Sequence, residues 1–380
     1  MAGRTLVITN DFPPRVGGIE SFVLAMVQRM DPASVVVHTA RQAGDAAFDA
    51  DLAFPVIRDA SRIMLPTPSI TKRSVAIARK MGCDSVWFGA AAPLGLMAAA
   101  LKSRAGVRRT VATTHGHEVW WAKTPGTRRL LHQIGESNDV LTYLGEYTRS
   151  KIAGALSPAA AARMVQLTPG VDVDAFNPSV DPQPVRQLYG LGERPVVVCV
   201  SRFVERKGQD MLIRALPWVQ RSVPDAAVLL VGDGPMREQL VRIASELGVA
   251  KDVVFAGAKP WAELPPFFAA GDVFCMPTRT RKAGFEVEGL GIVYLEASAT
   301  GLPVVAGDSG GAPDAVLDGE TGTVVDGTCP EAVADAVSQL LLDPERVGLQ
   351  GAAGRAWVES SWQWDQLGGR LRRLLAGQEP

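Results

Sequence analysis

Three glutamates within residues 283–301 are the side chains whose types and spacing point to chemistry. Glu286 and Glu288 lie in a glycine-punctuated loop, and Glu296 lies in the apolar segment that follows. A helix that starts near Gly291 leaves its first N–H groups without intrahelical acceptors, and its positive end favours an anion such as a diphosphate. These groups belong to Gly291, Ile292 and Val293.

The spacing of Glu288 and Glu296 suits an extended ligand. Glu296 follows the expected helix start by about 7.5 Å, at a rise of ~1.5 Å per residue. The two carboxylates can therefore hold the two ends of a ligand whose phosphates lie between them, and a sugar nucleotide has that shape. Taken alone, the pair equally fits a solvated loop followed by a charged helix surface.

Two cations follow a predicted strand in the second half of the chain. Ser201, Arg202 and Lys207 come directly after the apolar run 196–200. Ligands bind at the carboxyl ends of parallel strands, and a planar guanidinium and a point-like ammonium both suit a diphosphate. A charged surface turn would contain the same residues. Together with the helix start at Gly291, however, they predict a diphosphate site.

Two loops in the first half add further candidates. Gly17 and Gly18 follow a strand predicted over residues 5–9, and a backbone without side chains can approach a ligand closely. A tight turn is the alternative interpretation.

The second loop, after the strand predicted over residues 109–113, contains His115, His117 and Glu118. These residues supply too few ligands for a metal site, so we predict no metal. Either histidine could hydrogen-bond a sugar hydroxyl, and a structural role is the alternative.

Several motifs that would indicate another chemistry are rejected. Asp172-Val173-Asp174 lies in the predicted connection between domains, where a metal motif is out of place. The segment 232–237 begins like a dinucleotide fingerprint but has Arg237 where the third glycine belongs, and the chain has no P-loop. We therefore predict no cofactor. Gly257, Lys259 and Met276 are expected to line a nucleotide base.

The elements that must position these residues alternate between strand and helix, which predicts parallel sheets covered on both faces. The pattern restarts after residue 169. Each predicted strand below is a short apolar run: 5–9, 35–39, 85–88, 109–113 and 140–143 in the first half, then 196–200, 228–231, 253–255, 273–276, 303–306 and 323–325. An amphipathic helix is predicted over residues 362–375, with Trp362, Trp364, Leu367, Leu371 and Leu374 on one face.

Length and composition agree with two domains. The 380 residues exceed one ordinary core and suit two domains of ~150 to 200 residues. We predict an α/β protein with two Rossmann-like domains, 1–169 and 170–359, the first completed by a helix within 360–380. The four cysteines are far apart and predict buried thiols in a reduced compartment. The run 88–101 is too short to span a bilayer and predicts a buried helix.

Charge is divided unevenly along the chain. Residues 1–180 contain 20 Lys and Arg against 14 Asp and Glu, whereas the remainder contains 19 against 26. Ordinary solvated helix faces explain such a bias, and so does an anionic acceptor or membrane surface. Aromatic content of 6% without a basic and aromatic binding module argues against nucleic acid. The basic clusters include Lys72, Arg73, Arg79, Lys80, Lys102, Arg104, Arg108, Arg109, Lys123, Arg128 and Arg129.

With Glu288 and Glu296 eight positions apart, the chain resembles the retaining, nucleotide-sugar-dependent glycosyltransferases of the GT-B fold. The resemblance implies two Rossmann-like domains that face a central cleft. It implies that Glu288 contacts donor sugar hydroxyls, Glu296 the ribose, and Arg202 with Lys207 the leaving β-phosphate. It also implies that the Gly17-Gly18 loop approaches the donor phosphate. A histidine lies beside the donor sugar in this family; His115 aligns best, and His117 is the alternative.

Within that family, the chain looks like the actinobacterial mannosyltransferases that build phosphatidylinositol mannosides. The similarity lies in residues 10–19, 87–94, 114–119 and 286–296. It implies GDP-mannose as donor, phosphatidylinositol monomannoside as acceptor and an α-1,6 linkage. It further implies a cytoplasmic protein peripherally associated with the inner face of the plasma membrane, without an obligate protein partner.

Two other interpretations stay open at this point. One is a transferase of the same fold with another nucleotide-sugar donor or a soluble acceptor. The other is a non-catalytic nucleotide-sugar binding protein.

Overall fold

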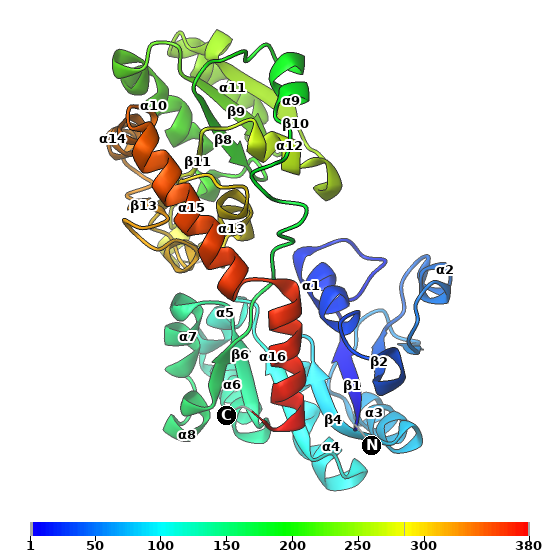
Figure 1. Ribbon diagram of the computed structural model, residues 1–380. Helices are drawn as coiled ribbons and strands as arrows, with labels where there is room; N and C mark the ends of the chain where they lie inside the picture. Colours follow the sequence, from blue (N-terminus) through cyan, green and yellow to red (C-terminus); the bar gives the residue numbers. More distant parts are fainter. Residues whose placement is uncertain (1–2, 285, 379–380) are drawn as a thin grey trace. The chain divides into compact units, whose positions relative to one another are not determined.

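A computed structural model describes residues 3–284 and 286–378, so Phe285, within the glutamate-bearing stretch, lies outside the described residues. The chain forms two compact units: unit 1 comprises Met1–Pro169 and Trp364–Pro380, and unit 2 comprises Gly170–Gln363. Each unit contains one sheet of parallel strands with helices against it (Figure 1). The predicted fold class, α/β with two parallel-sheet domains, is confirmed.

The sheet of unit 1 has seven strands in the order β3-β2-β1-β4-β5-β6-β7. Its strands are β1 (Arg4–Thr9), β2 (Val35–Ala40), β3 (Val56–Asp59), β4 (Cys83–Phe88), β5 (Arg109–Thr113), β6 (Val140–Tyr143) and β7 (Met164–Gln166). The sequence predicts all of them except β3 and β7. These two are the edge strands, short and partly exposed, so they lack the continuous apolar run of strands buried on both faces.

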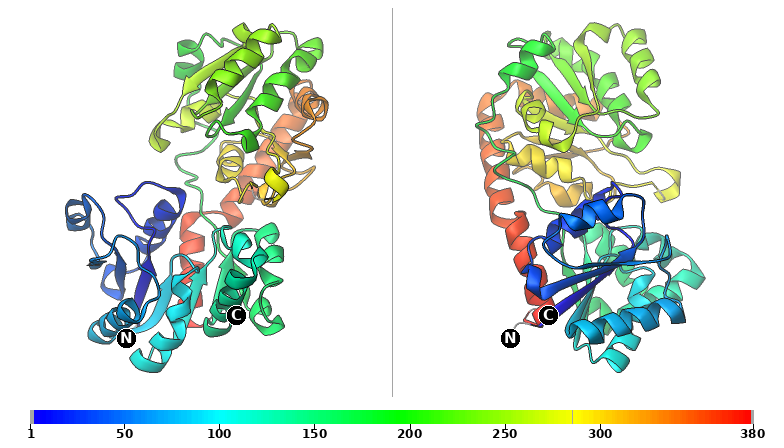
Figure 2. Two further views of the ribbon diagram at one scale, coloured as in Figure 1. Left: turned by 180° about the vertical axis from the view of Figure 1, so that it is seen from behind. Right: turned by 90° about the vertical axis from the view of Figure 1, so that its right-hand side faces the viewer.

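Helices cover both faces of this sheet, and the core of unit 1 therefore has two layers (Figure 2). One layer packs α3 and α4 onto the strands, and the other packs α1 and α16. The helices are α1 (Gly18–Val27), α2 (Asp45–Ala50), α3 (Pro68–Met81), α4 (Ala98–Ala105), α5 (Glu118–Lys123), α6 (Pro125–Ser137), α7 (Glu146–Ala153), α8 (Pro158–Ala162) and α16 (Trp364–Ala376).

The helix predicted over residues 88–101 is wrong in its first half. After β4, the backbone N–H of Gly89 donates to the carbonyl of Ile8 at 3.0 Å, and that of Ala91 donates to the carbonyl of Thr113 at 2.7 Å. These bonds continue the pairing of β4 with β1 and β5 beyond the last residue of β4. A 3₁₀ turn, Leu94–Met97, follows, and α4 begins only at Ala98. The segment is buried as predicted, but its first residues are bonded to neighbouring strands.

The sheet of unit 2 has six strands in the order β10-β9-β8-β11-β12-β13. They are β8 (Val196–Val200), β9 (Ala227–Val231), β10 (Val253–Gly257), β11 (Val273–Met276), β12 (Val304–Gly307) and β13 (Gly322–Val325). The larger helices are α9 (Gln183–Leu188), α10 (Gln209–Ser222), α11 (Arg237–Glu246), α12 (Pro265–Ala269), α13 (Ile292–Ala299), α14 (Pro330–Leu341) and α15 (Pro344–Ser361). All six strands were predicted, because each contains a run of apolar or β-branched residues in the sequence, although the edge strands β10 and β13 are only partly buried.

The amphipathic helix predicted from Trp362 begins two residues later and serves only one unit. Helix α15 ends at Ser361, and Trp362 is buried in the core of unit 2, where its ring centroid lies 5.3 Å from that of Trp357. Its carbonyl accepts from the N–H of Val171 at 2.7 Å. Helix α16 then begins at Trp364 and packs on unit 1. The apolar residues of one predicted face therefore belong to two separate cores.

Candidate donor-binding site

The predicted residues of unit 2 lie at one edge of its sheet. Ser201 and Arg202 directly follow β8, Gly257 ends β10, and Met276 ends β11. Because the strands are parallel, their carboxyl ends meet at the same edge. The loops there are in close contact. A Cβ on Gly208 would lie 1.9 Å from the carbonyl oxygen of Pro277, so only glycine fits.

The helix start predicted at Gly291 is present. Gly291 has a φ of 82° and precedes α13, and a Cβ there would lie 2.5 Å from the ring of Tyr294. No side chain caps this helix, and its first turn contains no acid. The amides of Ile292 and Val293 are therefore at a helix N-terminus whose first turn supplies no carboxylate of its own.

Lys207 and Glu288 form an ion pair in this region. The Lys207 Nζ lies 2.6 Å from the Glu288 Oε2, and the side chains are only 11% and 9% exposed. The carbonyl of Glu288 accepts from the N–H of Gly311 at 2.8 Å, which ties this loop to the end of β12. Glu288 also contacts the helix start, because its Cγ lies 3.5 Å from where a Cβ of Gly291 would be. Cation, carboxylate and helix end are thus close together.

This pairing changes what each residue must do on ligand binding. The resemblance assigns Lys207 to a phosphate and Glu288 to a sugar, yet here each is the partner of the other. An anion that binds Lys207 must compete with Glu288 for the ammonium group. Since the charges of the pair cancel, Lys207 attracts an anion fully only after Glu288 turns to another partner, such as a sugar hydroxyl.

Arg202 is placed differently from Lys207. Its side chain is exposed and has no hydrogen bond or ion pair with any described residue, and its carbonyl accepts from the Gln209 Nε2 at 3.1 Å. Its neighbour Ser201 accepts from the same amide group through Oγ, at 2.7 Å. The structure therefore fixes the backbone of this segment at the sheet edge, while the Arg202 guanidinium is not joined to Lys207 or Glu288.

The residues expected to line a base have mixed roles. Met276 is fully buried, and its carbonyl accepts from the Tyr294 hydroxyl at 2.7 Å, so this group is already engaged within the fold. Gly257 has a φ of 76°, and its carbonyl accepts from the N–H of Gly232 at 2.9 Å. Lys259 is partly exposed, with its Nζ 5.4 Å from the ring centroid of Phe267. Of these residues, Lys259 is the one whose side chain is accessible.

Glu296 lies in the second turn of α13 and is almost fully buried. Its Oε1 accepts a hydrogen bond from the indole Nε1 of Trp261 at 3.1 Å. Burial raises the pKa of this carboxyl to about 7, and the bond from Trp261 opposes that shift. Near neutral pH, Glu296 therefore exists in both protonation states, with an acceptor oxygen held by a neutral donor.

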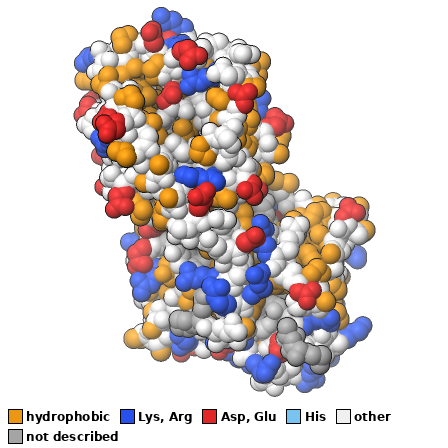
Figure 3. Space-filling model, viewed as in Figure 1, with side chains coloured by type: hydrophobic (Ala, Val, Ile, Leu, Met, Phe, Trp, Pro, Cys, Tyr) orange, Lys and Arg blue, Asp and Glu red, His pale blue; other side chains and the backbone are white. Residues whose placement is uncertain are grey.

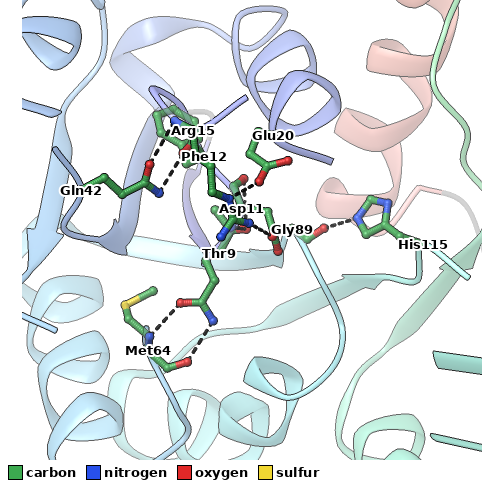
Figure 4. Close-up of polar contacts among 10 residues, drawn as sticks. Thr9, Asp11, Phe12, Arg15, Glu20, Gln42, Met64, Gly89 and His115 are labelled. Atoms are coloured by element: carbon green, nitrogen blue, oxygen red, sulfur yellow. Dashed lines mark hydrogen bonds and ion pairs between the residues drawn. The ribbon is translucent and has the colours of Figure 1, made fainter. Parts of the chain in front are cut away.

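In unit 1, the glycine loop between β1 and α1 contains its own charge network (Figure 4). Arg15 pairs with both Asp11 and Glu20. Glu20 lies in the first turn of α1 and is buried. A Cβ on Gly17 would lie 2.2 Å from the Glu20 Oε2, whereas one on Gly18 would meet nothing within 4 Å. A carboxylate of the chain thus already lies beside this helix N-terminus.

The two candidate histidines differ in environment. The His115 Nε2 lies 2.6 Å from the carbonyl oxygen of Gly89 (Figure 4), and its ring packs edge-on against Phe22. Because a carbonyl only accepts, Nε2 carries the proton and Nδ1 is left as an acceptor. Burial lowers the pKa of His115, although Glu118 opposes this. His115 is therefore a neutral ring with one acceptor nitrogen.

His117, in contrast, is exposed, with its Nε2 3.2 Å from the Glu118 Oε1. Glu118 is fully buried, and its Oε2 accepts from the backbone N–H of His115 at 2.9 Å. Glu118 therefore fixes the loop on which both histidines lie. The environment of His115 is the more restrictive, although the role of either residue toward a sugar stays a prediction.

Two groups at these sheet edges were not anticipated from the sequence. The first is Trp261, whose contact with Glu296 joins residues 35 positions apart. Nothing local in the sequence indicates it, apart from its place shortly after β10. The second is the network of Asp11, Arg15 and Glu20, which the sequence does contain as charges flanking the glycine pair. These flanking charges could have been used to predict the network from the sequence.

The chain is similar to several known proteins. The family described as glycosyl transferases group 1 matches residues 185–377. A Mycolicibacterium smegmatis protein named GDP-mannose-dependent alpha-(1-6)-phosphatidylinositol monomannoside mannosyltransferase is 52% identical over 98% of both chains. A Corynebacterium glutamicum protein, named as the corresponding monoacylated alpha-(1-6)-phosphatidylinositol monomannoside mannosyltransferase, is 45% identical over 98% of this chain and 97% of its own.

Among solved structures, the Anabaena protein HepE in complex with UDP has a TM-score of 0.80 at 20% identity, over 98% of this chain and 100% of its own. At that identity, the similarity concerns the fold alone. The family match covers half of the chain and contains every predicted site residue of unit 2, and the two relatives extend the match to nearly its full length. The chain therefore belongs to the group 1 glycosyltransferases.

Proposed function

We propose that this protein is a retaining mannosyltransferase that moves mannose from GDP-mannose to phosphatidylinositol monomannoside and forms an α-1,6 linkage. The observation that carries the proposal is the 52% identity, over 98% of both chains, with a relative named for this reaction. The arrangement in unit 2 supports it, because an uncapped helix start, a buried lysine and two buried glutamates suit a nucleotide sugar.

The chemistry we propose is a displacement on one face of the sugar. The acceptor hydroxyl attacks the anomeric carbon as the bond to the β-phosphate breaks, and its proton passes to a phosphate oxygen. Lys207, Arg202 and the amides at the start of α13 stabilise the charge that develops on the phosphate. When the donor binds, Glu288 accepts hydrogen bonds from sugar hydroxyls, which releases Lys207 from its ion pair. Neutral His115 offers Nδ1 as an acceptor to another hydroxyl.

The acceptor and the membrane belong to the same proposal. Unit 1 contains 23 Lys and Arg against 14 Asp and Glu. Figure 3 shows basic side chains over the face of unit 1 seen in that view. A cavity of about 470 Å³ beside α5 and α6 is lined in part by Lys123, Arg128, Arg129 and His132. Such a surface attracts anionic headgroups.

Among the described residues, no helix has the length and apolar character needed to cross a bilayer. We propose peripheral association of unit 1 with an anionic cytoplasmic leaflet. Sedimentation with vesicles tests this directly. Binding should require anionic phospholipid and weaken as salt rises; equal binding to zwitterionic vesicles contradicts it.

The transfer reaction is tested with purified protein, acceptor lipid in vesicles and a panel of GDP-mannose, UDP-glucose and UDP-N-acetylglucosamine. Mass spectrometry of the lipid should show one added hexose with GDP-mannose alone, and NMR should show an α-1,6 linkage. The double variant Glu288→Gln with Lys207→Ala should lose transfer. A product with another donor or on a soluble acceptor supports the other transferase interpretation, and binding without transfer supports a non-catalytic role.

A further inference from the structure

Trp261 is in an unusual position for a large aromatic residue. It begins the short 3₁₀ turn Trp261–Glu263 after β10, and 50% of its surface is exposed. Its ring is nevertheless oriented from two sides. The centroid lies 5.6 Å from that of the fully buried Phe176, in an edge-on arrangement, and the Nε1 donates to the Glu296 Oε1 at 3.1 Å. One edge of the indole is therefore anchored while much of the ring is accessible.

The carboxyl that Trp261 contacts has little other support. Glu296 is 6% exposed, and within residues 3–284 and 286–378 its side chain accepts no other hydrogen bond. Burial raises its pKa and the Trp261 bond lowers it. A carboxylate offers about four acceptor positions, so a single bond leaves most of its capacity unused. A buried carboxylate without further donors is costly, and a ligand that brings hydroxyl groups relieves that cost.

Charged groups on the neighbouring elements do not meet this need. On α15, which packs against α13, the Arg355 guanidinium donates to the carbonyls of Val173, Phe176 and Ala299 and pairs with Glu359. No charged residue is among the causes that shift the pKa of Glu296. Titratable residues on neighbouring segments include Arg355, Asp314, Glu263 and Lys259. The neutral indole N–H is thus the donor that determines how this carboxylate is held.

We propose that Trp261 is a positioning residue of the donor site, which holds the Glu296 carboxylate so that it accepts the two ribose hydroxyls of a nucleoside diphosphate. This inference rests on the proposed function and on the family resemblance, which implies that Glu296 contacts the ribose. The indole N–H fixes Oε1, and the acceptor positions that remain take the vicinal hydroxyls. Since the carboxylate is buried, a nucleotide without those hydroxyls leaves its remaining acceptor positions unfilled, and the site discriminates against that nucleotide.

The test compares the affinities of GDP and 2′,3′-dideoxy-GDP by calorimetric titration of the full chain. In the unmodified protein, GDP should bind about tenfold or more tightly than the dideoxy analogue, as expected for lost hydrogen bonds to a charged group. Trp261→Phe keeps an aromatic ring but removes the donor. Its preference for GDP should shrink to about threefold or less, while its affinity for the dideoxy analogue stays nearly unchanged. Trp261→His, which retains a ring N–H, should recover part of the preference.

Trp218→Phe is the matched control, because Trp218 is also partly exposed in unit 2 but contacts Arg221 on α10. It should behave like the unmodified protein. An unchanged preference in Trp261→Phe overturns the proposal. Equal weakening of both nucleotides also overturns it, because the ring then contributes packing alone. Should Trp261→Phe not fold, Trp261→Leu and Trp261→His are compared in the same way, and equal preferences in the two overturn the proposal.

The outcome is separable from that of the transfer assay. If GDP-mannose proves not to be the donor, the same titrations with the diphosphate of the actual donor and its dideoxy analogue still measure ribose preference. If transfer from GDP-mannose occurs but the unmodified protein shows no ribose preference, the role of Trp261 is wrong and the proposed function stands.

Discussion

Two helix starts, one in each unit, follow strands of a parallel sheet and begin at glycines, yet the charged groups beside them are arranged differently. In unit 1, the first turn of α1 contains the buried Glu20, which pairs with Arg15. In unit 2, the first turn of α13 contains no acid and no side-chain cap. The dipole of α1 is therefore met by an acid within its own first turn, whereas the carboxylate beside the start of α13, Glu288, comes from the preceding loop and is paired with Lys207.

This difference indicates where an anionic donor is held. The same glycine signal appears in both loops, but in unit 2 the helix start without an acid in its first turn lies near a largely buried ion pair that contains a lysine, Lys207. Lys207 is itself occupied by Glu288, so the unit 2 site exchanges one carboxylate for a phosphate. We infer that unit 2 makes the stronger contacts to the diphosphate. The following experiments test this difference between the units.

The largest effect is expected from the cations. Lys207→Ala should lower kcat/KM for transfer by about 10² to 10³, the loss typical of one donor to developing charge. Arg15→Ala, its counterpart beside α1, should lower kcat/KM by less than about tenfold, because Arg15 pairs with two carboxylates of its own loop. Equal losses in the two variants contradict the asymmetry. Lys207→Ala leaves Glu288 buried without its partner, and melting temperatures show how much of the loss in kcat/KM comes from the resulting destabilisation.

The two glycines should differ in their effect on stability. Gly291→Ala introduces a Cβ at a φ of 82° and 2.5 Å from the Tyr294 ring, and should lower the free energy of unfolding by about 2 kcal/mol. Gly18→Ala meets nothing within 4 Å and should change it by about 0.5 kcal/mol or less. Urea unfolding of both variants measures the difference. A tolerated Gly291→Ala is incompatible with the described start of α13.

Nucleotide binding should depend on pH through unit 2. The pKa of Glu296 is raised to about 7, so its ionised, hydroxyl-accepting form is lost as pH falls through 7. Affinity for GDP should fall by about tenfold between pH 8 and pH 6. Glu296→Gln, titrated in parallel, removes this component and leaves only the titration of the nucleotide phosphate. The same pH slope in both proteins argues against ribose contact by Glu296.

The contribution of Glu296 to folding stability changes with pH in the opposite direction to its contribution to GDP binding. A carboxyl whose pKa is higher in the folded state binds more protons when folded, so its contribution to stability is lost as pH rises from about 4.5 to 7. His115 in unit 1 behaves differently, because burial lowers its pKa from 6.5 and it is already neutral at pH 7. Glu296, and not His115, should therefore produce the pH dependence of GDP binding between pH 8 and pH 6.

The smallest effects concern the histidine pair. His115→Ala should lower kcat/KM by about tenfold, the value of one lost hydrogen bond, because Nδ1 is left as an acceptor when Nε2 donates to Gly89. His117→Ala should change kcat/KM by less than about threefold, because His117 is exposed and pairs only with Glu118. Steady-state kinetics of the two variants decide between them. A larger loss in His117→Ala would reverse the assignment.

Much of the fold could be predicted because central parallel strands are buried on both faces. Runs such as 196–200 are continuously apolar and therefore recognisable in sequence. The edge strands β3 and β7 escaped prediction because β3 has two apolar residues before Arg58 and β7 is three residues long, which is too little for a recognisable apolar run. The C-terminal segment shows another limit. Trp362 and Trp364 fit one helical face by their spacing, but the chain between them pairs with Val171 and separates two cores.

The sequence by itself determined the two-sheet architecture, the glycine at the start of α13 and the order of charged residues after each strand, because these follow from periodicity and local backbone requirements. Only the tertiary structure decided which charges meet. Lys207 and Glu288 are paired, Trp261 holds Glu296, and Glu20 lies at the start of α1. Such contacts depend on how loops from different strands fold over one sheet edge, and burial then fixes their strength; neither is encoded in the spacing of residues along the chain.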